Sequence, residues 1–113
     1  MDPEHHHRAF LGRLYAAFTL IRTVDEAEQF LKDLCTPQEL NAMADRWRVV
    51  QPIKAGTPYR QIYDETGVSV TTIGRVARCI TYGTGGYDLI FRRQANAKRT
   101  TDQNSDPKKR EIK

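Results

Sequence analysis

Residues 59–82 read YRQIYDETGVSVTTIGRVARCITY, and this stretch decides the fold. Its apolar residues recur at intervals of three and four, which predicts two short helices separated by a turn. Gly67 suits the turn because glycine readily adopts a left-handed conformation, and Ser69 is placed to cap the second helix. Two short helices joined by a tight glycine-containing turn are typical of a helix-turn-helix. We therefore expect an all-α protein with a helix-turn-helix over residues 59–82.

The predicted helix-turn-helix has an apolar side and a polar side. The spacing predicts burial of Ile62, Val68, Ile73, Val76 and Ile80. The opposite side carries Thr71, Thr72, Arg75 and Arg78, and no acidic residue occurs from Ser69 to Tyr82. In a major groove, threonine contacts base edges or thymine methyl groups, and arginine pairs with guanine or a phosphate. Tyr59 and Arg60, which open the first helix, would meet the DNA backbone. The alternative is that the two helices only pack, with solvated arginines.

Amphipathic helices are also predicted on both sides of this stretch. A helix is expected over residues 8–22, and capping boxes at Thr23 and Thr36 predict two further helices. The last of these is expected to extend to Lys54, with Pro52 bending or ending its last turn. Glycines at 83, 85 and 86 precede a short apolar helix. We expect disorder in residues 1–7, a helical DNA-binding domain over 8–92, and a disordered basic tail over 93–113.

Composition limits the other possibilities. The net charge is +4, but residues 92–113 hold eight basic and three acidic side chains, so the remainder is close to neutral. DNA affinity must therefore come from a few placed side chains, with the tail as a further phosphate-binding arm or only a solvated end. No signal-peptide core or membrane-length apolar run is present, and Cys35 and Cys79 fit reduced core thiols, which together predict a cytoplasmic protein.

The sequence does not support a catalytic site or a metal-binding site. The sequence has no paired-carboxylate, Cys–His or phosphate-loop arrangement, so we expect no enzyme activity and no cofactor. The histidines at positions 5–7 could bind a metal, but at a terminus they are better explained as incidental or as a tag remnant, and we expect no metal site.

Several motifs within and outside the central stretch together resemble one family. Thr36 and Pro37, then Arg46, Arg48, Val49 and Val50, then Gly56, then Thr72, Ile73 and Arg75 resemble the Trp repressor superfamily in order and spacing. The segment YGTGGY over residues 82–87 is similar to its YerC/YecD branch. The resemblance covers residues 8–92 and implies a Trp-repressor-like fold, with an interlocked homodimer that binds a palindromic site on double-stranded DNA.

The resemblance also implies particular roles for single residues. The positions that match DNA contacts are Arg60, Val70, Thr71, Thr72 and Gly74. The positions that match the tryptophan site are Thr36, Arg46, Arg75 and Cys79. Here Val76 replaces a glycine and Cys79 a serine of that site, while Asp33 falls near a position that is apolar in the family. The valine fills space that an indole needs and the carboxylate opposes an anion, so a small-molecule effector is possible but tryptophan is disfavoured.

The sequence as a whole predicts a DNA-binding transcriptional regulator, most simply a repressor, with or without a small-molecule corepressor. The predicted DNA-contacting residues are Tyr59, Arg60, Ser69, Val70, Thr71, Thr72, Gly74, Arg75 and Arg78. The alternative is a protein-interaction module that keeps the helix-turn-helix scaffold without reading DNA sequence.

Overall fold

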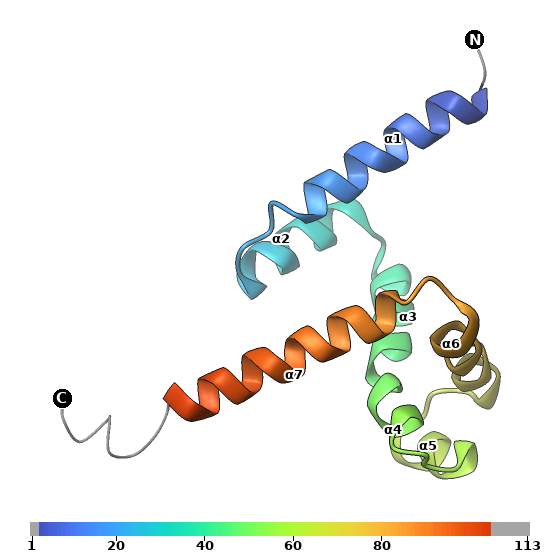
Figure 1. Cartoon of the computed structure of the whole chain (residues 1–113). Helices are drawn as coiled ribbons and strands as arrows, with labels where there is room; N and C mark the ends of the chain where they lie inside the picture. The colour runs from blue at the N-terminus through green and yellow to red at the C-terminus, as the bar shows by residue number, and fades with distance from the viewer. Residues whose placement is uncertain (1–2, 105–113) are drawn as a thin grey trace. The chain divides into compact units, whose positions relative to one another are not determined.

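The computed structural model describes residues 3–104, and within that range it contains helices and no strand (Figure 1). The helices are α1 (Pro3–Phe18), α2 (Val24–Leu34), α3 (Pro37–Arg48), α4 (Val50–Lys54), α5 (Tyr59–Thr66), α6 (Val70–Tyr82) and α7 (Gly86–Asn104). The predicted all-helical fold is confirmed. The chain divides into two compact units, one up to Ala42 and one from Met43 onward.

The N-terminal unit contains both predicted capping boxes. Thr36 Oγ1 accepts a hydrogen bond from the Glu39 amide at 3.1 Å, and Glu39 Oε1 accepts one from the Thr36 amide at 2.8 Å. Thr23 Oγ1 likewise accepts from the Glu26 amide at 3.1 Å. Glu26 Oε1 accepts from the amide of Arg22, one residue before the expected partner, at 3.0 Å. These bonds satisfy amides that would otherwise lack a partner at the helix starts.

The apolar side chains of α1 and α2 are largely uncovered within the chain. Neither helix contains a buried residue. Phe10 in α1 is 60% exposed and Val24 in α2 is 85% exposed, although Phe18 makes an edge contact with Phe30 at 5.7 Å between ring centroids. The apolar side chains predicted for these helices are therefore present, but the helices form no buried core between them.

The predicted third helix is interrupted at Val49, three residues before Pro52. It is continuous only to Arg48, and α4 begins at Val50, with Val49 between them at φ −88° and ψ −6°. Pro52 explains the position of the break. A proline has no N–H to donate to the carbonyl four residues earlier, here that of Arg48, and its ring crowds that carbonyl.

The core lies in the C-terminal unit, where α4, α5 and α7 all contact α6 (Figure 1). The fully or almost fully buried side chains are those of Val49, Val50, Ile62, Val68, Ile73 and Val76. Trp47, Ile53, Ile80, Tyr87 and Phe91 pack around them and are partly buried. Four of the five residues predicted to be buried in the helix-turn-helix are thus in the core, and Ile80 lies at its edge.

Both ends of the described chain are more helical than expected. Helix α1 already starts at Pro3, so the expected disorder of residues 1–7 is wrong from that residue onward. Proline is favourable at a first helical position, and Glu4 suits the positive end of the helix dipole. Helix α7 continues to Asn104, where a disordered tail was expected from residue 93. Its arginine, glutamine, alanine and lysine residues are good helix formers, which the polar composition concealed. The rest of the predicted tail lies outside the described residues.

The two cysteines differ from the expectation of core thiols. Cys35 is half-buried and Cys79 is exposed, and both are free. Cys79 lies at the edge of the apolar stripe of α6, beyond Val76, so the core does not reach it. No helix in the described part of the chain is long and apolar enough to cross a membrane.

Candidate nucleic-acid interface

The turn between α5 and α6 is fixed by one glycine and one threonine. Gly67 has φ 76° and ψ −1°, a left-handed conformation that other residues rarely adopt, and its amide donates to the Tyr63 carbonyl. Thr66 Oγ1 donates to the Ile62 carbonyl at 2.7 Å and accepts from the Val68 amide at 3.1 Å. The turn is thus closed by hydrogen bonds that involve no flexible long side chain.

Ser69 starts α6 by capping it. Its Oγ accepts from the Thr72 amide at 3.1 Å and lies 3.0 Å from Thr72 Oγ1, to which it donates. This cap satisfies one of the free amides at the helix start. Ser69 was predicted as a DNA contact, and the structure places it on the surface with its hydroxyl already engaged in the cap.

The apolar sides of α5 and α6 are held firmly by the core. Ile62 and Ile73 are completely buried, and Val76 is 1% exposed. Val68, in the turn, is 4% exposed. Because these residues fix the rotation of α6 about its axis, the side chains opposite them must face outward.

The outward side of this helix pair holds the predicted DNA contacts. Tyr59, Arg60, Val70, Thr71, Arg75 and Arg78 are exposed, and Thr72 and Gly74 are half-buried. Val70 is notable because 51% of this apolar side chain remains exposed. Among the described residues, none of the three arginines forms an ion pair, so their guanidinium donors are available to an external ligand.

The charges of the helix-turn-helix are unevenly placed. Its two acidic residues, Asp64 and Glu65, both lie on α5, and Glu65 accepts a hydrogen bond from Gln61 at 2.9 Å. Helix α6 carries only positive charge, at Arg75 and Arg78. A polyanion is therefore attracted to α6 and not to the C-terminal end of α5.

The predicted effector residues are partly brought together. Arg46, Arg75 and Cys79 line one cavity of about 300 Å³, together with Thr72, Val76 and Tyr87. Thr36 belongs to the N-terminal unit, where its hydroxyl caps α3. The Val76 side chain, which was expected to occupy the space that an indole needs, lines the same cavity as the two arginines.

Tyr87 is the lining residue that sequence reasoning missed. Its ring stacks on that of Trp47 with centroids 6.4 Å apart and planes inclined by 10°. The sequence feature that could have pointed to Tyr87 is the glycine-rich segment before it, because Gly85 has φ 88° and turns the chain into α7. Lys54 pairs with Asp88 in the first turn of α7, and its ammonium lies 5.4 Å from the centre of the Phe91 ring. These contacts hold α7, and with it Tyr87, against the core.

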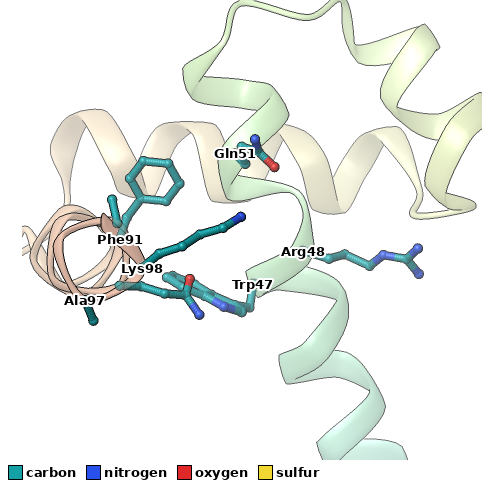
Figure 2. A pocket seen from close by; sticks show the side chains of 8 residues that line it. Trp47, Arg48, Gln51, Phe91, Ala97 and Lys98 are labelled. Atoms are coloured by element: carbon teal, nitrogen blue, oxygen red, sulfur yellow. The ribbon is translucent and has the colours of Figure 1, made fainter. Parts of the chain in front are cut away.

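A larger cavity of about 650 Å³ lies between α7 and the end of α3 (Figure 2). Trp47 points from α3 toward α7, with Phe91 and Lys98 on the α7 side, whereas Arg48 points away from them (Figure 2). The remaining lining residues are Gln51, Gln94, Ala95 and Ala97. Aromatic and aliphatic surface is thus left open on this unit.

Comparison with known proteins gives consistent matches. The family model described as Trp repressor protein matches residues 10–95. The protein YerC of Bacillus subtilis (strain 168) is 35% identical over 83 residues, which are 74% of this chain and 80% of YerC. A TrpR-like protein from Eubacterium eligens ATCC 27750 is similar in structure, with a TM-score of 0.73, 33% identity and coverage of 77% of this chain and 90% of that one. A solved protein from Staphylococcus aureus gives a TM-score of 0.75 with 35% identity, over 84% of this chain and 95% of its own.

Proposed function

The chain belongs to the Trp repressor family, and on that premise we propose that it is a transcriptional regulator that recognises a specific DNA sequence. The family is one of DNA-binding regulators rather than of enzymes. The observation that carries the proposal is the outward side of α6, which has no acidic side chain and where Arg75 and Arg78 are exposed and form no ion pair with any residue that the structure describes. We expect the protein to act as a repressor, with α6 in the major groove.

The geometry of the helix pair supports this docking. Helix α6 is held by its buried side, so its first turns can enter a groove without losing core contacts. Thr71 and Thr72 present a methyl group and a hydroxyl each near the start of the helix, where base edges are met first. Arg60, in the first turn of α5, lies where the preceding helix crosses the phosphate backbone.

We propose further that the protein binds DNA as an interlocked homodimer at a palindromic site. Two observations support it: α1 and α2 bury none of their own apolar residues, and the cavity beside Trp47 and Phe91 is open (Figure 2). A partner's N-terminal helices would cover that surface, which a chain of this length can hardly bury alone. Analytical ultracentrifugation should give a dimer at micromolar concentration, and a monomer there would contradict the proposal.

A small-molecule effector is not required by this arrangement. Arg46 and Arg75 offer guanidinium groups that suit a planar anion, but the cavity they line also contains Val76 and the Tyr87 ring. We therefore propose that tryptophan is not the effector and that DNA binding proceeds without it. Calorimetry with tryptophan should show no tight binding, and a low-micromolar dissociation constant would overturn this part.

The function is tested by gel shifts on the DNA upstream of the protein's own gene, over a range of salt concentrations. Arg60→Ala and Thr72→Ala are compared with the wild type, and Arg22→Ala, in the N-terminal unit, is the matched control for loss of a charge. We expect tight, sequence-dependent binding that Arg60→Ala and Thr72→Ala weaken and Arg22→Ala preserves. Binding that is absent, or that is the same for any sequence, would refute the regulator and favour a protein-interaction module.

A further inference from the structure

Within the described part of the chain, nothing requires the residue at position 74 of α6 to be glycine. Gly74 does not have a positive φ. A Cβ added to it would meet only Arg78 Nη1, at 3.8 Å, which is an ordinary contact with a flexible side chain. Glycine inside a helix is less favourable than alanine, because its backbone loses more conformational freedom on folding. Neither the backbone conformation nor the packing of the described residues explains this cost, whereas the close approach of another molecule to the helix backbone would explain it.

The position of Gly74 points to the same conclusion. It lies one turn after Val70 and Thr71 and one turn before Arg78, all three of them exposed. At 3.6 residues per turn these four residues share one side of the helix. Gly74 therefore forms a notch in the middle of the surface that would face the DNA.

The Arg78 side chain reaches back over this notch. Side chains on a helix incline toward its N-terminus, and Arg78 Nη1 would lie 3.8 Å from a Cβ of residue 74, closer than any other side-chain atom beyond the two neighbouring residues. The guanidinium has no ion-pair partner in the described part of the chain. Its donors are thus held over the centre of the outward side, closer to the first turn of α6 than the position of residue 78 alone would suggest.

We propose that Arg78 is a sequence-reading residue that binds a guanine edge in the major groove, and that Gly74, which has no side chain, lets the bases come close to the helix backbone beside the guanidinium. Arginine donates two parallel hydrogen bonds to guanine O6 and N7, the commonest specific contact in that groove. An alanine methyl at position 74 would make only an ordinary contact with the guanidinium, but it would project from the outward side of α6 and keep the helix further from the bases. This inference rests on the proposed function, and it adds the identity of one recognised base and of the residue that contacts it.

The test begins with selection of bound duplexes from a randomised pool by the wild type, Arg78→Ala, Gly74→Ala and the control Arg22→Ala. The wild type and the control should enrich one motif that contains a guanine in each half-site. Arg78→Ala should enrich the same motif with that guanine no longer required. Gly74→Ala should melt at a higher temperature by circular dichroism and yet bind the motif more weakly.

A modified base then identifies the contact. Replacing the guanine by 7-deazaguanine removes the N7 acceptor and leaves base pairing intact, and should weaken wild-type binding about tenfold but leave Arg78→Ala binding unchanged. If Arg78→Ala keeps the full guanine preference, or only weakens binding to all sequences equally, Arg78 is not a base-reading residue. If the wild type enriches no motif, the proposed function itself is refuted.

Discussion

Ser69 allows the stability of α6 to be separated from its contact with DNA. Its Oγ caps the helix by accepting from the Thr72 amide. Ser69→Ala removes the cap, Ser69→Asn keeps it without charge, and Ser69→Asp keeps it and adds a negative charge. The three variants share one exposed position, so core packing is the same in all of them.

The expected magnitudes follow from this geometry. Loss of the cap in Ser69→Ala should lower the free energy of unfolding by about 1 kcal/mol. This corresponds to a decrease of roughly 4 °C in the melting temperature. Ser69→Asp should be at least as stable as Ser69→Asn, because a carboxylate is favourable at a helix start. In the DNA complex, a carboxylate about 6 Å from a phosphate is repelled by about 0.7 kcal/mol at low salt. Two such phosphates would weaken binding about tenfold.

Thermal unfolding and fluorescence anisotropy with a labelled duplex measure the two effects separately. We expect Ser69→Ala to lose stability, and Ser69→Asp to lose DNA affinity at unchanged stability, with the loss shrinking as salt is added. Equal DNA affinities of Ser69→Asp and Ser69→Asn at low salt would refute the placement of the α6 N-terminus against DNA. An unchanged melting temperature of Ser69→Ala would refute the capping role.

Three further predictions concern the fold. Ile73→Ala, at a completely buried position, should lower the free energy of unfolding by about 2–5 kcal/mol in urea titrations, and a loss below about 1 kcal/mol would contradict the assigned core. Hydrogen bonds from the backbone and side chain of Thr36 lower the pKa of Glu39 below its ordinary value. The capping box should therefore stabilise the fold above the unfolded-state pKa of Glu39 and lose this effect as the pH falls through the folded-state pKa. The free energies of unfolding of wild type and Glu39→Gln, from urea titrations, should converge in acid, and a difference that stays constant with pH would contradict this. The Lys54–Asp88 pair is partly exposed, so a double-mutant cycle with Lys54→Met and Asp88→Asn should give a coupling energy of at most about 1 kcal/mol that decreases with salt. A salt-independent coupling energy above about 2 kcal/mol would contradict the assignment of this pair as a surface ion pair.

The helix-turn-helix could be predicted from the sequence because its determinants are local. The left-handed glycine at 67, the cap at Ser69 and the apolar spacing all act within a few residues of the chain, and the structure shows each of them. The capping box at Thr36 was predictable for the same reason. Each local preference agrees with the final fold.

The missed features depend on partners far along the chain or on two opposing local signals. The stacking of Tyr87 on Trp47 joins residues that no spacing rule connects. Helix α7 was expected to end early because its polar composition resembles disorder, while its individual residues favour a helix. The break at Val49 comes before Pro52 because the missing hydrogen bond belongs to the carbonyl four residues earlier.

The central claim is that α6 reads DNA sequence rather than only carrying positive charge. The most direct measurement is the ratio of wild-type affinities for the upstream duplex and for a scrambled duplex of the same composition, by anisotropy at several salt concentrations. We predict a ratio of roughly 10³ or more near physiological salt, with both affinities falling as salt rises. A ratio near one at every salt concentration would contradict the claim.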